Sequence, residues 1–204
     1  IMPWVTKASD DFNRASGGVG ANWTTWEIVV NAGGLVVAQN RCTAQGSTWQ
    51  FSGSYYSAVA PNDNQRITAT ATASKGASYW YMMFIRWTGG ATKNGYYAQF
   101  DGGGATNVIY RVLNGVSGAA ILVAGSKPAI TANMQVRMTA EGSLISVETN
   151  SGAGWSTRMS VTNSEIPSGG TGGLAVQNWG DQHGWDNMLL EENRIKWPLP
   201  SFRG

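Results

Sequence analysis

The chain has 204 residues, of which only 13% are charged, and its formal net charge at pH 7 is +2. Because the lysines and arginines are also scattered, the chain lacks the electrostatic footprint of a nucleic-acid-binding protein. No apolar run has the length of a membrane span, and the single cysteine, Cys42, excludes a disulfide within the chain. A domain of this size must therefore be held together by its own hydrophobic core.

Short apolar runs, separated by Gly, Asn and Ser, extend along most of the chain. The clearest lies at 66–73, where Ile67, Ala69 and Ala71 alternate with polar residues. A period of two indicates a strand with one buried face. Asn-Gly pairs, which are typical of hairpin turns, flank two of the other runs. These runs lie at 96–101, 108–113, 120–123, 134–139 and 144–148. The pattern predicts an all-β protein folded as one closed sandwich.

The run Tyr79–Trp87 differs from the others because it is apolar on both faces. Such a run predicts a central strand that is covered on both sides. The alternative is that one of its faces is an aromatic surface for a ligand.

We divide the chain into an N-terminal extension at 1–9, a single sandwich domain at 10–192 and an extended arm at 193–204. In the arm, Pro198 and Pro200 lack backbone donors and favour an extended conformation. Apolar contacts from the arm are then expected from Trp197, Leu199 and Phe202. These side chains either pack back on the domain or contact a neighbouring subunit.

Two motifs mark the ends of the predicted domain. The first is Asp10-Asp11-Phe12-Asn13-Arg14 with Gly18, Gly20, Asn22 and Trp23, and the second is Gly173-Leu174 with Trp185-Asp186-Asn187-Met188. Together they resemble the concanavalin A-like lectin/glucanase jelly rolls, in particular those of bacteriophage structural proteins such as minor tail and capsid-decorating proteins. The second motif departs from this pattern at Met188, where an aromatic residue is commoner. The resemblance implies a two-sheet antiparallel jelly roll with adjacent first and last strands, a fold used for glycan binding or particle assembly.

The chemistry of the first motif agrees with adjacent chain ends. Phe12 and Trp23 are expected in the core, whereas Asp11 and Asn13 would face the other way and could hydrogen-bond the last strand near Asp186. Pairing of the two ends would also blunt two strand edges that otherwise invite aggregation.

The carboxylates do not follow the pattern of a glycoside hydrolase. Glucanases of this fold place carboxylates at alternate positions of one strand, and glycosidic cleavage needs two of them at a fixed separation. No Glu-x-Asp-x-Glu pattern occurs here, and the adjacent Glu191 and Glu192 would face opposite sides of a strand. The only histidine, His183, lies in a stretch typical of a polar loop. We therefore expect a non-enzymatic protein.

A structural calcium ion is the one cofactor that the sequence suggests. Asp10, Asp11 and Asp186, with Asp181 nearby, would lie close together if the chain ends meet, and Ca²⁺ takes about six to eight oxygen ligands. Calcium is also common among the lectins that the chain resembles. The alternative is that no metal binds and that Asp186 caps a turn.

The best candidate for a glycan site is the stretch at 178–185. Its aromatic residues, Trp179 and Trp185, can stack on the apolar faces of sugars. Its polar residues, which can bind sugar hydroxyls, are Asn178, Asp181, Gln182 and His183. Second candidates are Tyr55-Tyr56, and Tyr97 with Gln99 and Asp101. The alternative is that the ten Trp residues fill the core and subunit contacts.

The resemblance implies a structural or adhesion protein of a bacteriophage particle, located on the capsid or the tail at the virion surface, and the carboxylate pattern favours a non-enzymatic one. Low charge, abundant Thr and aromatic residues and an apolar arm favour a homo-oligomer, such as a trimer. Its partners would be other virion proteins and cell-surface glycans. The first alternative is a free carbohydrate-binding lectin or module, and the second is a glycoside hydrolase or lyase.

Overall fold

The computed structural model describes residues 3–26, 33–44, 51–73, 80–90, 92–101, 107–124, 127–177 and 183–193. These ranges form strands and no helix, so no helix within them could cross a membrane. The strands are β1 Trp4–Asp10, β2 Gly17–Gly18, β3 Trp23–Thr25, β4 Leu35–Ala38, β5 Arg41–Ala44, β6 Phe51–Tyr56, β7 Gln65–Ala71, β8 Trp80–Thr88, β9 Asn94–Asp101, β10 Asn107–Leu113, β11 Val116–Ala124, β12 Gln135–Glu141, β13 Leu144–Asn150, β14 Ser156–Thr162, β15 Thr171–Gln177 and β16 Trp185–Asn193.

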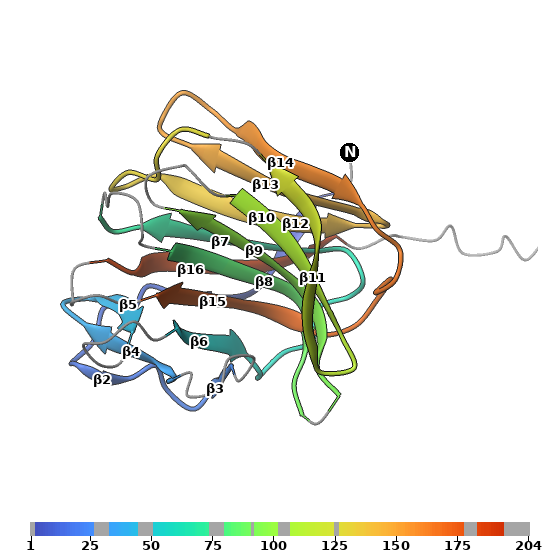
Figure 1. Ribbon diagram of the computed structural model, residues 1–204. Helices are drawn as coiled ribbons and strands as arrows, with labels where there is room; N and C mark the ends of the chain where they lie inside the picture. Colours follow the sequence, from blue (N-terminus) through green and yellow to red (C-terminus); the bar gives the residue numbers. More distant parts are fainter. Residues whose placement is uncertain are drawn as a thin grey trace, which may run out of the picture.

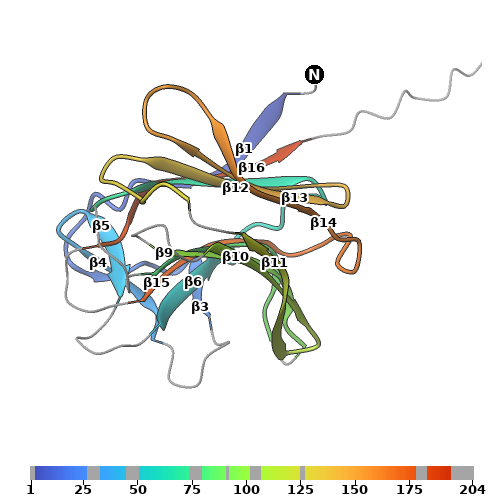
Figure 2. The same ribbon diagram turned by 45° about the horizontal axis from the view of Figure 1, so that its top comes forward.

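The strands form two sheets that face each other (Figures 1 and 2). The nine-stranded sheet has the order β14-β13-β12-β7-β16-β5-β4-β2, and β1 also pairs with β16. The seven-stranded sheet has the order β11-β10-β9-β8-β15-β6-β3. All pairs of these strands are antiparallel. The predicted two-sheet antiparallel sandwich is confirmed.

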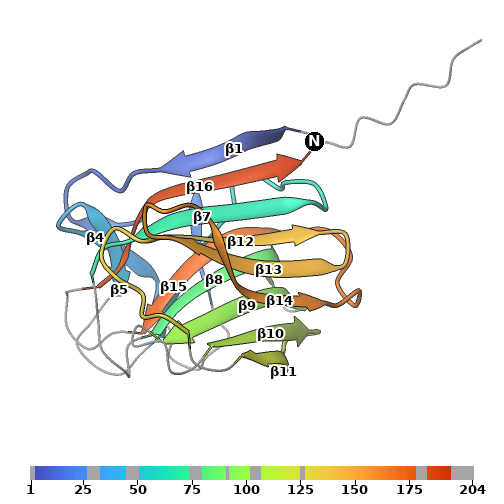
Figure 3. The ribbon, with the colours of Figure 1, turned by 90° about the horizontal axis from the view of Figure 1, so that it is seen from above.

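The first and last strands lie side by side, as Figure 3 shows. Trp4 is opposite Asn193 at one end of this pair, and Asp10 is opposite Met188 at the other. Residues 4–9, which were predicted to be part of an N-terminal extension, form most of β1, and Asn193, which was predicted to be part of the arm, is the last residue of β16. Only Ala8 of β1 is buried, so the strand has too few apolar residues to show a period of two.

Strand β7 shows how the alternating pattern builds the main core between the sheets. Ile67, Ala69 and Ala71 are fully buried, whereas the residues between them are partly exposed. The inward-facing residues of β7 pack in one cluster with those of the opposite sheet. The expected burial of one face is confirmed for this strand.

Strand β8 is buried on both faces, as its apolar sequence predicts. Tyr81, Met83 and Ile85 belong to the main core, and Phe84 and Trp87 belong to a second cluster on the other face of the seven-stranded sheet. The prediction of a central strand covered on both sides is confirmed.

The second cluster is covered by Trp26, which follows β3. Its indole lies 4.4 Å from the ring of Phe84, between centroids, and is 1% exposed. The close approach depends on Gly53 of β6, where an added Cβ would lie 2.7 Å from the Trp26 ring. The second cluster is therefore sealed by a residue of the chain itself.

Arg86 is the one charged residue within the apolar sequence of β8, and it is fully buried. Its φ of 52° lies at an irregularity of the β8–β9 register, which turns the side chain inward. The guanidinium donates hydrogen bonds to the backbone carbonyls of Asp63, Gly142 and Ile166. Burial lowers the pKa of Arg86 from its usual value. This side chain joins three loops at one end of the sandwich.

Candidate functional site

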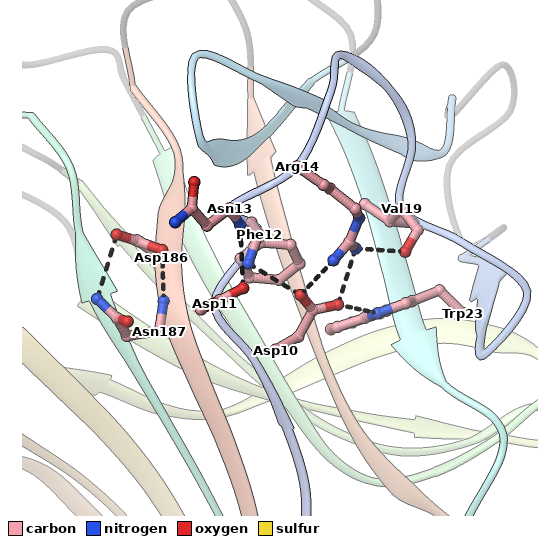
Figure 4. A network of polar contacts seen from close by, with 9 residues as sticks. All are labelled: Asp10, Asp11, Phe12, Asn13, Arg14, Val19, Trp23, Asp186 and Asn187. Carbon is pink, nitrogen blue, oxygen red and sulfur yellow. Dashed lines mark hydrogen bonds and ion pairs between the residues drawn. The ribbon is translucent and has the colours of Figure 1, made fainter.

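The first motif is organised around the carboxylate of Asp10, at the end of β1 (Figure 4). Oδ1 accepts hydrogen bonds from the backbone N–H of Phe12 at 2.9 Å and from Nη1 of Arg14 at 2.7 Å. Oδ2 accepts from Nη2 of Arg14 at 2.9 Å and from Nε1 of Trp23 at 2.9 Å. Two carboxylate oxygens have about four acceptor positions, and all four are used here.

These contacts favour the ionised form of Asp10. Burial by itself would raise the pKa of Asp10, but the hydrogen bonds from Arg14, Phe12 and Trp23 outweigh it, so the pKa lies below its usual value. Arg14 also donates to the carbonyl of Val19 at 2.7 Å, which closes the loop between β1 and β3. Asp10 therefore fixes the geometry of this loop.

Phe12 and Trp23 both lie in the core, as predicted. Their ring centroids are 5.7 Å apart, and Trp23 makes an edge-on contact with Tyr56 of β6 at 5.4 Å. Phe12 has a φ of 50°, which turns its ring inward immediately after Asp11, whose side chain is exposed. The left-handed residue thus separates the buried and exposed sides of the motif.

A cavity of about 720 Å³ lies beside this motif, at the rim of the sandwich where β1 and β16 face β3 and β6. We call it the rim cavity. Two aromatic residues and several hydrogen-bonding side chains line it together. Among them are Asp11, Arg14, Asn22, Trp23, Tyr56 and Asn187. The rim cavity thus combines an apolar wall with carboxylate, guanidinium and amide groups.

On the neighbouring strand, Asp186 and Asn187 form a local pair (Figure 4). Asp186 accepts hydrogen bonds from the backbone N–H of Asn187 at 2.8 Å and from its Nδ2 at 3.1 Å. Burial and the nearby carboxylates of Asp11 and Asp10 raise the pKa of Asp186, against the effect of the Asn187 N–H. Asp11 likewise bonds locally, to the backbone N–H of Asn13 at 3.0 Å, rather than to the last strand as expected.

The predicted calcium ligands Asp10, Asp11 and Asp186 therefore lie near one another, as expected, but they do not form an open ligand set. The acceptor positions of Asp10 are occupied by the four protein donors described above, so Asp10 has a structural role in this loop. No group of three or more His, Cys, Asp or Glu residues within the described ranges is arranged to hold a metal ion. Calcium binding stays a prediction.

The structure describes only part of the predicted glycan-binding stretch. Trp185 and His183 are fully buried, and Trp185 donates to the carbonyl of Ala175 at 3.0 Å and packs against Tyr81. Neither ring can stack on a sugar, so their assignment as ligand contacts was wrong. The other four residues of that prediction, Asn178, Trp179, Asp181 and Gln182, lie outside the described residues, as do Trp197, Leu199 and Phe202 of the arm.

The residues predicted as second candidates for a glycan site lie in different parts of the structure. Tyr56 lines the rim cavity, whereas Tyr55 lines a smaller cavity of about 370 Å³ beside Trp87. Tyr97 is buried beneath Tyr110, with ring centroids 4.6 Å apart. Gln99 of the same strand is partly exposed, and the side chain of Asp101 lies outside the description.

Four of these residues of the rim cavity were not proposed as ligand contacts from the sequence: Arg14, Asn22, Trp23 and Asn187. All four belong to the two motifs, which indicated their proximity but not their exposure toward a cavity. An exposed amide next to a core Trp is the pattern that could have indicated this site.

No protein-family profile and no curated protein matches the chain, but solved structures do. The carbohydrate-binding module CBM66 from Bacillus subtilis is 16% identical, with a TM-score of 0.57 over 87% of this chain and 96% of that one. The CBM2 module of the evolved Dit of Lactobacillus casei BL23 phage J-1 is 13% identical, with a TM-score of 0.60 over 96% and 99%. A Bacillus licheniformis β-glucanase is 11% identical, with a TM-score of 0.60 over 92% and 98%.

At these identities the likeness concerns the fold alone. The architecture is the concanavalin A-like jelly roll that carbohydrate-binding modules, lectins and glucanases have in common.

Proposed function

We propose that this protein is a non-catalytic carbohydrate-binding module and that the glycan binds in the rim cavity. The observation that carries the proposal is the composition of the cavity wall. The half-buried Tyr56 supplies an aromatic surface for the apolar face of a sugar, and the core residue Trp23 lies against it at the cavity wall. Asp11, Asn22 and Asn187 supply the acceptors and donors that sugar hydroxyls require.

The aromatic wall is held in place before any ligand arrives. Trp23 is fixed through its Nε1 by Asp10 and through its ring by Phe12 and Tyr56. A side chain that is already ordered loses little conformational freedom on binding. The exposed Asp11 and Asn22 lie in the loop that Arg14 closes, so the polar contacts are also partly ordered.

The carboxylates of the rim cavity favour binding over hydrolysis. Cleavage of a glycosidic bond requires an acid and a second carboxylate facing the same bond. Asp10 is saturated by four donors, and Asp186 is not among the residues that line the cavity, which leaves Asp11 alone. The strands of the seven-stranded sheet contain one acidic residue, Asp101. Neither the rim cavity nor the strands of the seven-stranded sheet therefore provide two available carboxylates for hydrolysis.

A glycan array probed with the purified chain tests this function, together with titration calorimetry against soluble β-glucan. Asn22→Ala removes an exposed amide from the cavity and should weaken binding by about 5- to 30-fold, which corresponds to one hydrogen bond of about 1–2 kcal/mol. Asn13→Ala is the matched control, because Asn13 is an exposed amide of the same loop that does not line the cavity. Wild-type protein that retains no glycan would refute the function. Equal effects of the two variants would refute the site.

A second role, on a bacteriophage particle, is favoured by the likeness to the phage J-1 Dit module, which extends over 96% of this chain. In this role the module would lie at the surface of a virion and direct it to host glycans, in a homo-oligomer bound to other virion proteins. Mass spectrometry of purified particles and light scattering of the isolated chain test the proposal. A strictly monomeric chain that no particle contains would contradict it.

A further inference from the structure

Trp155 is a large aromatic side chain that takes no part in either core cluster. It lies in the connection between β13 and β14 and is 36% exposed. The other large hydrophobic residues that are exposed in the described ranges belong to other segments: Val5, Val116, Val123 and Leu144. Trp155 therefore presents part of its indole to solvent, outside both clusters.

The turn that carries Trp155 is rigid. Oδ1 of Asn150 accepts hydrogen bonds from the backbone N–H groups of Gly152 at 2.8 Å and Gly154 at 3.1 Å. Both glycines have φ values near 105°, specifically 106° and 104°, which side-chain-bearing residues rarely adopt. The position of Trp155 is therefore fixed by the turn before it.

The indole ring is also fixed from below. The guanidinium of Arg137 on β12 lies 4.0 Å from the ring centroid of Trp155, a distance at which a cation and an aromatic ring attract each other. Arg137 is opposite Glu148 on β13, and its Nε donates to Oε2 of Glu148 at 2.6 Å. One face of the indole is thus supported by an ion pair on the outer surface of the nine-stranded sheet.

The surroundings of Trp155 are polar and electrically neutral. Thr157 of β14 is opposite Glu148 and is exposed, and so is Gln135 of β12. The energetic centre of a protein–protein interface is normally a cluster of apolar residues sealed from water, and no such cluster surrounds Trp155. A single supported aromatic ring among hydroxyl and amide groups suits a neutral sugar.

We infer that Trp155 is a second carbohydrate contact, on which a neutral sugar ring of a longer glycan stacks, with Arg137 and Glu148 holding the indole in position. This inference rests on the proposed function. The indole of Trp155 lies over Arg137 of β12, and β12 is three strand spacings from β1 across β7 and β16, which is about 14 Å at about 4.8 Å per strand. A short oligosaccharide in the rim cavity cannot reach Trp155, whereas a polysaccharide can.

Ligands of different length distinguish the two contacts experimentally, because only a long ligand can occupy both. The probes are soluble β-glucan and every glycan that the wild-type chain retains on the array, each as a polymer or multivalent conjugate and as a free short oligosaccharide of two sugars. Trp155→Ala should weaken binding of the polymer by at least about tenfold, because simultaneous contacts raise the apparent affinity. Its affinity for the short oligosaccharide should stay within about twofold of wild type.

Three further variants test whether the effect of Trp155→Ala is specific to the aromatic ring. Trp155→Phe retains an aromatic face and should bind the polymer within about threefold of wild type. Leu144→Ala, an exposed apolar residue of β13, is the matched control and should change neither affinity. Asn22→Ala should weaken the binding of both the polymer and the short oligosaccharide, because both occupy the rim cavity.

The possible failures are distinguishable. Wild-type protein that binds no glycan overturns the proposed function, and this inference with it. Normal polymer binding by Trp155→Ala overturns only the second contact. An equal loss of polymer and oligosaccharide by Trp155→Ala, at an unchanged Tm, would place the primary site at Trp155 and also overturn the inference.

Discussion

Replacement of Asp10 by Ala should destabilise the protein by about 3 kcal/mol at pH 7. The side chain of Asp10 is 10% exposed, and that of Arg14 is 38% exposed. Arg14 can therefore turn to water, so its two hydrogen bonds are replaced at little cost. The buried donors, Nε1 of Trp23 and the backbone N–H of Phe12, cannot, and each unsatisfied group costs about 1–3 kcal/mol. In a domain of 204 residues this corresponds to a fall in Tm of about 6–12 °C.

Chemical denaturation at several pH values measures this effect and identifies its cause. The folded-state pKa of Asp10 lies below its usual value of 3.8, so the stabilisation is complete above that pH and is lost as the pH falls through the folded-state pKa. The difference between wild type and Asp10→Ala should therefore narrow between pH 4 and pH 2. Asp11→Ala is the control and should change stability by less than about 0.5 kcal/mol. A loss below 1 kcal/mol for Asp10→Ala, or a difference that persists unchanged at pH 2, would refute the reasoning.

Arg86→Met should lower the free energy of unfolding by about 2 kcal/mol, because the buried carbonyl of Ile166 loses its donor, whereas the carbonyls of the exposed residues Asp63 and Gly142 can bind water instead. A loss below 1 kcal/mol in a denaturant titration would contradict this. Burial and the carboxylates of Asp11 and Asp10 raise the pKa of Asp186, so its ionised form destabilises the fold once the pH rises through that pKa. Asp186→Asn should raise the Tm slightly at pH 7 but not at pH 2.5, and a lower Tm at pH 7 would oppose this assignment. Burial raises the pKa of the Cys42 thiol, so a thiol reagent at pH 8 should react only with urea-unfolded protein and should modify one thiol per chain. Rapid reaction of the native protein would contradict this, because it would show that Cys42 is accessible.

The fold was predictable from the sequence wherever burial follows a local pattern. Strand β7 alternates between buried and partly exposed residues, and β8 is apolar on both faces, so both showed their environment in their residue types. Strand β1 did not, because only Ala8 enters the core. The inward turn of Arg86 was also beyond local reasoning, since it depends on a backbone irregularity that its apolar neighbours do not indicate.

The candidate site was predictable in its location but not in its chemistry. The two motifs correctly indicated that Phe12 and Trp23 lie in the core beside the last strand. The structural role of Asp10 was not predictable, because the indole N–H that occupies its second oxygen comes from a residue thirteen positions away. Trp185 was assigned wrongly for a similar reason, because polar neighbours in the sequence do not prevent an aromatic ring from entering the core of a folded sandwich.

The pairing of β1 with β16 has a mechanical consequence. Tension applied outward at Trp4 and Asn193 would act on the hydrogen bonds between the two strands one at a time, since these residues are opposite each other at one end of the pair. Strands loaded in this way separate by peeling and resist less force than strands that slide past each other. Peeling would reach the Asp10 carboxylate last, so the four bonds that it accepts would be the final obstacle to detachment of the strand.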